Sequence, residues 1–315
     1  MAQLTLFGKQ NEAARLRALR ADRRIPHAIM LTGAKGMGKK FFARWCAMLM
    51  LCENENAPCM ECRSCHKILN DDHPDVIYAK GEKYTADSVR EIVNKSTLYP
   101  NDADIRIVIF EDCDEMNEVQ QNILLKAIEE PSSHNRYIFT CENTSLILST
   151  IISRVVSIPL SEMTAEECRA CLVNKGISET AAAEHIKMLG TNPGKILSVI
   201  ADKKQIALYE SAARIAEYIA NGNEYETARE LALYSDREEI FSILYAVYEK
   251  VCSAVKPYDT EDKTVKELRQ GLSVKKLYAL TRRIEELTAL SDFNVNARVF
   301  AAYCSSRMYE IIADI

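Results

Sequence analysis

A glycine-rich turn between an apolar segment and an amphipathic segment constrains the fold of this chain more than any other feature. The turn reads GAKGMGKK over residues 33–40 and follows the apolar residues 28–31. A strand, a glycine turn and a helix in this order form a phosphate-binding P-loop, in which backbone N–H groups and a lysine contact phosphate oxygens. The residues that fit this nucleotide-site pattern are Gly33, Gly36, Gly38 and Lys39.

Position 40 departs from the P-loop pattern. A Ser or Thr hydroxyl that holds Mg²⁺ is expected there, and this chain has Lys40 instead. A lysine ammonium is a donor only, so it cannot coordinate a metal ion, and it adds a second positive charge. The turn therefore predicts the shape of a nucleotide site without part of its metal chemistry, and we do not expect firm binding of ATP or Mg²⁺.

Five short apolar segments alternate with helical patterns in the first half of the chain. Amphipathic segments such as 88–96 and 118–129 lie between them. This alternation predicts an α/β domain over residues 1–160 with a five-stranded, mostly parallel sheet covered on both faces. Ligands of such sheets bind at the carboxyl ends of the strands, where the glycine turn lies. The predicted strands are residues 28–31, 75–78, 105–110, 137–140 and 155–158.

The strand signals stop at Pro159, and the rest of the chain has helical periodicity. After Gly194 only Gly222, Gly271 and Pro257 interrupt the helical pattern. We predict a small helical domain over residues 161–205 and a separate helical bundle over residues 206–315.

Charge and hydropathy exclude several classes of protein. The formal net charge is −5, so the chain as a whole has no basic excess of the kind that binds DNA. No apolar run reaches the roughly 18 residues of a membrane span, and the N-terminal residues lack the basic start and apolar core of a signal peptide. We expect a cytoplasmic protein without a membrane partner.

Four of the eleven cysteines lie within fourteen residues, with spacings of six, two and two residues between them. Four thiolates satisfy tetrahedral Zn²⁺ and leave no open position, which predicts a structural metal. An iron–sulfur cluster and four unrelated buried thiols are the alternatives, and His66 or His73 could replace the first cysteine as a ligand. The predicted ligands are Cys52, Cys59, Cys62 and Cys65.

Two acidic residues follow the central apolar segment. Glu111 and Asp112 stand where P-loop ATPases of this layout carry Asp and then Glu, which support Mg²⁺ and polarise the attacking water. The order is inverted here, so each carboxylate has the wrong length for its role. They are candidates for the nucleotide site, or two solvated carboxylates at a strand end. Thr140, at the end of the fourth predicted strand, either faces a phosphate or caps the strand.

Several further motifs resemble the clamp-loader branch of the AAA+ ATPases, and in particular the clamp loader of bacterial DNA polymerase III. The resemblance covers residues 1–160 well and 161–205 loosely, and over 206–315 it rests only on helical character. The segments that carry it are His27-Ala28, the four-cysteine insert, HPD at 73–75, VREI at 89–92, NILLKAIEEP at 122–131 and TIISR at 150–154.

The resemblance implies a division between motor and non-motor subunits. The motor subunits, called gamma or tau, have an intact P-loop and an intact Asp-Glu pair, whereas Lys40 and the Glu111-Asp112 order favour a non-motor subunit. The family places a phosphate-sensing arginine at the start of a lid helix, and Lys195 occupies that place here. The implied architecture is an AAA+ domain with a zinc module, a helical lid, and a helical collar for oligomerisation.

The resemblance also assigns a role to Arg154. In this family a Ser-Arg-Cys motif supplies an arginine finger to the ATP of a neighbouring subunit, and here it reads Ser153-Arg154-Val155. The implied partners are the gamma or tau and delta subunits, with the sliding clamp and primed DNA reached through the assembled loader of the polymerase holoenzyme. Two other functions remain open: an active gamma- or tau-type motor, and a stand-alone zinc-dependent nucleic-acid-binding protein.

Overall fold

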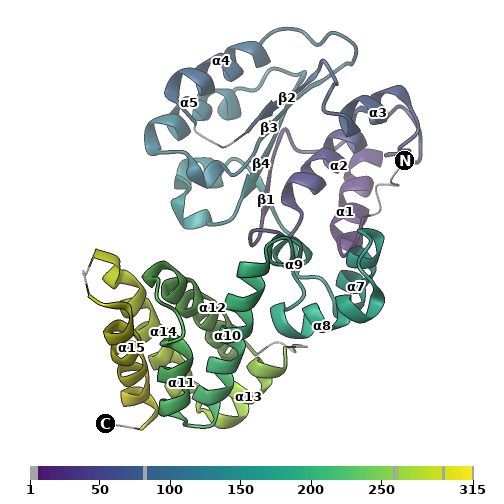
Figure 1. Cartoon of the computed structure of the whole chain (residues 1–315). Helices are drawn as coiled ribbons and strands as arrows, with labels where there is room; N and C mark the ends of the chain where they lie inside the picture. Colours follow the sequence, from purple (N-terminus) through teal and green to yellow (C-terminus); the bar gives the residue numbers. More distant parts are fainter. Residues whose placement is uncertain (1–5, 81–83, 258–259, 261, 293–294, 314–315) are drawn as a thin grey trace. The chain divides into compact units, whose positions relative to one another are not determined.

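The computed structural model of this chain describes residues 6–80, 84–257, 260, 262–292 and 295–313. It divides into two compact units, residues 1–164 and 165–315 (Figure 1). The first unit has an α/β fold and the second is helical, as the sequence predicts.

The first unit is built on a five-stranded parallel sheet in the order β2-β3-β4-β1-β5. The predicted strands are all present, with bounds that differ by one or two residues. Strand β3, which lies between β2 and β4, is buried at every position, as expected for a parallel sheet that is covered on both faces. The strands are β1 (Ala28–Thr32), β2 (Val76–Ala79), β3 (Arg106–Phe110), β4 (Asn135–Cys141) and β5 (Val156–Pro159).

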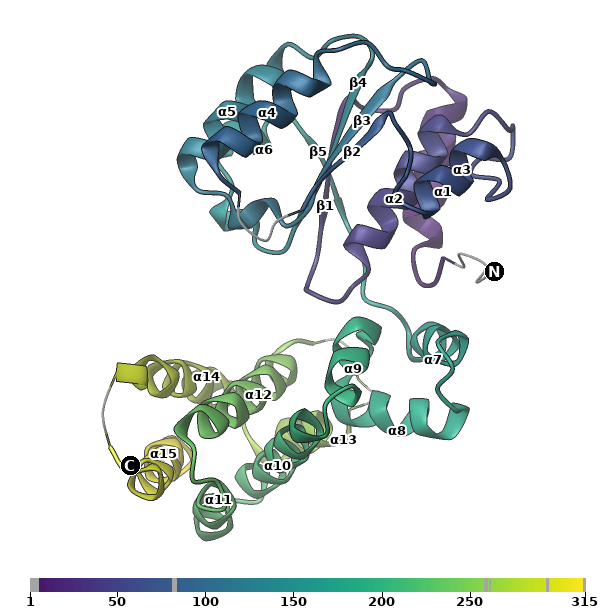
Figure 2. The ribbon, with the colours of Figure 1, turned by 45° about the horizontal axis from the view of Figure 1, so that its top comes forward.

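Helices cover both faces of this sheet (Figures 1 and 2). Alternate residues of β1 point to opposite faces, so Ile29 and Leu31 pack with the first three helices, whereas Ala28 and Met30 pack with the next three. One face carries α1 (Gln10–Ala21), α2 (Lys39–Leu51) and α3 (Arg63–Leu69). The other carries α4 (Ala86–Ser96), α5 (Glu118–Glu129) and α6 (Ser149–Ile152), with the 3₁₀ turns η1 (Cys113–Glu115) and η2 (Thr144–Leu146) beside them.

A buried carboxylate fixes the connection that leads into β3. The Asp75 side chain is fully buried and accepts hydrogen bonds from the backbone N–H groups of Asn101 (2.6 Å), Asp102 (2.7 Å) and Ala103 (3.0 Å). The Arg106 guanidinium lies 3.4 Å from the same carboxylate. Burial opposes the charge of Asp75, but these donors outweigh it and hold the pKa of the carboxyl below its usual value.

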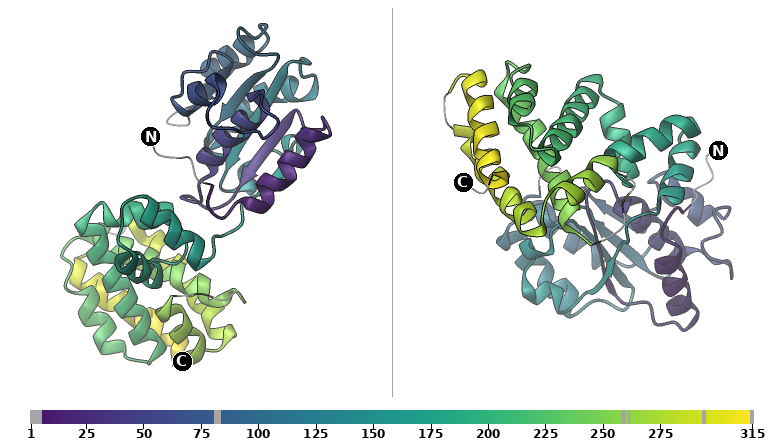
Figure 3. Two further views of the ribbon diagram at one scale, coloured as in Figure 1. Left: turned by 90° about the vertical axis from the view of Figure 1, so that its right-hand side faces the viewer. Right: turned by 90° about the horizontal axis from the view of Figure 1, so that it is seen from below.

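The second unit is helical throughout its described residues, and one continuous core joins the helices from α10 onward (Figures 2 and 3). The predicted boundary near residue 205 falls at the start of α10 and stays a prediction. No helix within the described residues is long and apolar enough to cross a membrane. The helices are α7 (Ala165–Asn174), α8 (Glu179–Leu189), α9 (Pro193–Ile200), α10 (Lys203–Ala220), α11 (Glu224–Leu231), α12 (Arg237–Val255), α13 (Lys263–Gly271), α14 (Val274–Thr288) and α15 (Ala297–Ile312), with the 3₁₀ segment η3 (Ala289–Asp292).

Replacing Asp75 by Asn should lower the free energy of unfolding by roughly 3–5 kcal/mol, because it leaves Arg106 buried beside an uncharged partner. The depressed pKa makes this contribution fully present above the unfolded pKa of about 3.9, and it is lost as the pH falls through the folded value. Urea unfolding across that pH range checks both effects. Asp102→Asn, at the exposed pair with Lys67, is the control and should change stability little.

Candidate functional site

The glycine turn has the predicted strand–turn–helix geometry. Strand β1 ends at Thr32, and α2 begins at Lys39. Gly38 precedes the helix with a φ of 83°, a left-handed conformation that glycine adopts without the cost of a Cβ. The first backbone N–H groups of α2 are therefore presented at the carboxyl end of the sheet.

The P-loop lysine is folded back onto its own turn. Lys39 is buried, and its Nζ donates hydrogen bonds to the carbonyl oxygens of Gly33 (2.7 Å) and Ala34 (3.1 Å). A phosphate that binds in this turn must compete with these two carbonyls for the ammonium.

Lys40 joins the P-loop helix to both acidic residues at the end of β3. Its Nζ lies 2.7 Å from an Asp112 carboxylate oxygen and 3.1 Å from a Glu111 carboxylate oxygen. Burial opposes the charge of Lys40, but the hydrogen bonds to Asp112 and Glu111 outweigh it and raise the pKa of the ammonium. The carboxylates that would support Mg²⁺ in an ATPase of this layout are thus paired with an internal cation.

Backbone geometry holds the acidic pair in place. Asp112 has a positive φ of 50°, and its backbone N–H donates to the Thr140 hydroxyl at 2.7 Å. The Tyr84 hydroxyl donates to the backbone carbonyls of Glu111 and Ala79. In the described structure the Thr140 oxygen is therefore directed at the turn after β3. Contact between Thr140 and a phosphate stays a prediction.

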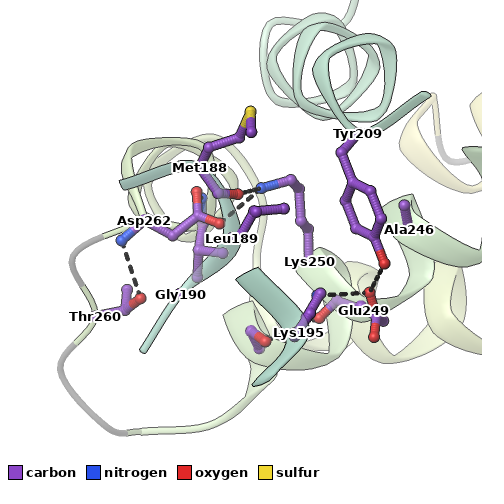
Figure 4. A pocket seen from close by; sticks show the side chains of 12 residues that line it. Met188, Leu189, Gly190, Lys195, Tyr209, Ala246, Glu249, Lys250, Thr260 and Asp262 are labelled. Atoms are coloured by element: carbon purple, nitrogen blue, oxygen red, sulfur yellow. Dashed lines mark hydrogen bonds and ion pairs between the residues drawn. The ribbon is translucent and has the colours of Figure 1, made fainter. Parts of the chain in front are cut away.

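Lys195 lies in the first turn of α9, where the lid-helix resemblance places it, and its ammonium is paired inside the second unit. Its Nζ is 2.8 Å from a Glu249 carboxylate oxygen and 5.0 Å from the ring centre of Tyr209. Figure 4 shows Lys195 and Tyr209 converging on Glu249. The predicted contact between Lys195 and a nucleotide is not tested by this arrangement and stays a prediction.

Lys195, Tyr209 and Glu249 line a small cavity of about 60 Å³. A second ion pair, between Lys250 and Asp262, lines the same cavity. The Lys250 ammonium is buried and lies 2.6 Å from Asp262 and 2.8 Å from the carbonyl oxygen of Met188 (Figure 4). Burial lowers the pKa of Lys250 despite the opposing charge of Asp262. Met188 belongs to α8 and Lys250 belongs to α12, so the hydrogen bond between them joins the predicted lid to the predicted collar within this unit.

Arg154 follows the short helix α6 and is held by three acceptors. Its Nη2 lies 2.9 Å from a Glu129 carboxylate oxygen, and its Nη1 donates to the Thr150 carbonyl (2.9 Å) and the Ser153 hydroxyl (3.1 Å). The Arg154 side chain is 38% exposed. It lines an open pocket of about 380 Å³ together with His27, Ile128, Glu129 and Glu130.

The structure brings the four clustered cysteines together. Their Sγ atoms all lie within 4.8 Å of one another, as ligands of one ion must, and neither His66 nor His73 belongs to the group. Cys52 directly follows α2 and Cys62 directly precedes α3, so the cluster links these two helices. The ligands predicted from the sequence are Cys52, Cys59, Cys62 and Cys65.

The surroundings of the sulfurs suit a metal. Backbone N–H groups of Cys59, Cys62 and Cys65 donate to the sulfurs of Cys52, Cys59 and Cys62 at 3.3–3.4 Å. A backbone hydrogen bond from Glu61 is the largest of the effects that lower the pKa of the Cys59 thiol to about 7, whereas burial raises the pKa of the Cys52 and Cys65 thiols. A bound metal ion would offset this rise, because a coordinating thiol loses its proton. Four sulfur ligands suit Zn²⁺, and an iron–sulfur cluster remains the alternative.

The fold and the site together define a class. A parallel sheet with a P-loop after β1 and paired acids after β3, followed in the chain by a helical unit, is the arrangement of an AAA+ protein. The family model described as "DNA polymerase III, delta subunit" matches residues 8–164. Over these residues the chain belongs to the clamp-loader family of DNA polymerase III subunits, which confirms the resemblance found in the sequence.

Relatives with different subunit names match this chain. It is 26% identical to DNA polymerase III subunit gamma of Buchnera aphidicola subsp. Baizongia pistaciae, over 63% of this chain and 52% of the relative. It is 25% identical to DNA polymerase III subunit delta' of Bacillus subtilis, over 61% of this chain and 58% of the relative. It is 32% identical to DNA polymerase III subunit delta' of Pseudomonas aeruginosa, over 41% of this chain and 42% of the relative. The chain spans about half the length of these relatives.

Removal of the metal should destabilise the first unit, because the cluster ties the end of α2 to α3. Cys59→Ser should release bound metal and lower the melting temperature, whereas Cys171→Ser, at a half-buried thiol outside the cluster, should retain the metal. Elemental analysis of the purified protein gives the identity and stoichiometry of the ion. A wild-type protein that holds no metal after expression with zinc or iron would contradict the assignment.

Proposed function

We propose that this chain acts as the delta prime subunit of a DNA polymerase III clamp loader and hydrolyses little or no ATP by itself. The observation that carries the proposal is the contact of the Lys40 ammonium with both Glu111 and Asp112. Mg²⁺ requires oxygen ligands in nearly ideal octahedral geometry. The Lys40 ammonium, which is part of the chain itself, already pairs with the carboxylate oxygens that would support Mg²⁺.

Two further positions support the loss of motor activity. The acidic residues have the order Glu111-Asp112 instead of Asp-Glu. The longer side chain therefore stands where the shorter one is expected, and the shorter one where the longer is expected. Lys195 replaces the arginine of the lid, and its ammonium is paired with Glu249. A lysine in that place also lacks the bidentate fork with which arginine grips a phosphate.

Arg154 supplies the contribution of this chain to catalysis. Its guanidinium is partly exposed beside an open pocket, and a cation presented in trans stabilises the charge that develops on a transferred phosphoryl group. The ATP that it serves belongs to a neighbouring gamma or tau subunit. The helical second unit joins the chain to these subunits and to delta, and the assembled loader opens a sliding clamp and places it on primed DNA.

The four-cysteine cluster binds structural Zn²⁺ in this proposal. Four thiolates close the coordination shell, so the ion supplies no site for a substrate. Its effect is to fix the end of α2, the helix that begins with the last two residues of the P-loop, Lys39 and Lys40.

A gamma- or tau-type motor is the second candidate, and the similarity to subunit gamma of Buchnera aphidicola favours it. In that case Lys40 would move aside when Mg²⁺ and ATP bind, and Asp112 would act as the base. The contact of Lys40 with two carboxylates argues against this candidate.

The purified chain should bind ATP without dependence on Mg²⁺, or not at all, and should show no turnover. Lys40→Thr frees both carboxylates and restores a hydroxyl at the metal position, so it should make ATP affinity increase with Mg²⁺ by roughly tenfold or more. Calorimetric titration with and without Mg²⁺ measures the change. Lys35→Thr, at an exposed lysine of the same turn, is the matched control. Mg²⁺-dependent turnover by the wild-type chain would establish the motor instead.

Arg154→Ala should leave assembly intact and remove the ATPase activity of the one site that Arg154 serves in the reconstituted loader. An arginine finger accelerates phosphoryl transfer at its site by roughly 10³-fold or more. Steady-state ATPase assays of loaders that contain wild-type or variant chain measure the loss. Arg15→Ala, at an exposed arginine of α1, serves as the control. Equal activity of the Arg154→Ala and wild-type loaders would remove the arginine finger from the proposal.

A further inference from the structure

We propose that Glu129 is a positioning residue that orients the Arg154 guanidinium for a neighbour's nucleotide. The inference rests on the proposed function of Arg154. It is carried by the 2.9 Å ion pair between the Glu129 carboxylate and Nη2 of Arg154, at the rim of the open pocket that both residues line.

The hydrogen bonds of Arg154 leave a defined part of its guanidinium for a ligand. A guanidinium has five N–H donors in a rigid fork. Within the described residues, both donors of Nη1 are directed at Thr150 and Ser153, and one donor of Nη2 is directed at Glu129. The Nε–H and the second Nη2–H remain, and they can contact phosphate oxygens.

Glu129 differs from the other two acceptors in where it comes from. Thr150 and Ser153 belong to the same short segment as Arg154, so their hydrogen bonds orient the guanidinium only relative to that segment. Glu129 is the last residue of α5, which packs on the sheet through buried residues such as Leu124 and Ile128. The Glu129 contact therefore fixes the guanidinium relative to the core of the unit.

A second contact holds the segment before Arg154 rigidly against α5. Gln121 of α5 is buried, accepts a hydrogen bond from the backbone N–H of Leu148 at 2.8 Å, and donates one to the carbonyl of Leu146 at 2.9 Å. The segment that leads into α6 and Arg154 is thus joined to α5 at Gln121 and again, two helical turns later, at Glu129. Arg154 has a long side chain with several rotatable bonds, and fixing its rotamers in advance lowers the entropic cost of the step that needs the guanidinium in place.

The pocket also offers a matched control. Glu130 is adjacent to Glu129 and lines the same pocket, but no contact of its side chain with Arg154 is recorded in the described structure. Removal of either carboxylate changes the local charge by the same amount. Only removal of Glu129 also removes the orienting contact.

Steady-state ATPase kinetics of the reconstituted loader test the inference. Glu129→Ala should lower the Arg154-dependent part of kcat, defined as the difference between the wild-type and Arg154→Ala loaders, by roughly tenfold. KM for ATP should not change, because the nucleotide binds in the neighbour. Glu129→Gln keeps an oxygen acceptor and should retain an intermediate kcat, and Glu130→Ala should match the wild type. Glu129→Ala should have no further effect in the Arg154→Ala background.

The outcomes separate the two proposals. If Arg154→Ala lowers kcat but Glu129→Ala behaves like the wild type or like Glu130→Ala, the role of Glu129 is refuted and the arginine finger stands. A rise in kcat with Glu129→Ala would mean that the carboxylate competes for the guanidinium, which also refutes it. A silent Arg154→Ala variant overturns both proposals. Melting temperature and co-elution with the other subunits verify that each variant folds and assembles.

Discussion

The ion pairs that Lys40 forms with Glu111 and Asp112 are the contact on which the rest of this site depends. A nucleotide site needs positive charge near phosphate and negative charge near the metal, and the two are usually balanced by the bound ligands. Here one ammonium from α2 pairs with both carboxylates after β3 and offsets one of their two negative charges. The glycine turn, the parallel sheet and the helix of a nucleotide site are present beside this internal pair.

The sequence predicted the architecture of the first unit because its signals are local. Apolar segments of four to six residues, the glycine turn and the four-cysteine spacing each depend on neighbouring residues. The contacts that give the site its character are not local. Lys40 and Glu111 are far apart in the chain, and so are Arg154 and Glu129. The sequence singled out Lys40 and the acidic residues separately as departures from the nucleotide-site pattern, but it did not predict the contact between them, and nothing in the sequence indicated the second pair.

The second unit shows the limit of helical periodicity. The pattern predicted helices, and the structure has them, but periodicity does not reveal which polar residues lie between helices. The resemblance to the clamp-loader family implied a place near phosphate for Lys195, and in the described structure its ammonium pairs with Glu249 on α12. The buried pair of Lys250 and Asp262 has no signal in the sequence, since both residues are polar in otherwise amphipathic segments.

Helix α5 begins at Glu118, six residues after Asp112, and ends at Glu129, so it spans twelve residues and about 18 Å. One inserted or deleted residue would turn its end by about 100° and move Glu129 out of reach of the guanidinium. The exposed surface of this helix is free to change in composition, but its length is not. The length of α5 therefore helps to fix where Glu129 and Arg154 lie relative to the acidic residues that follow β3.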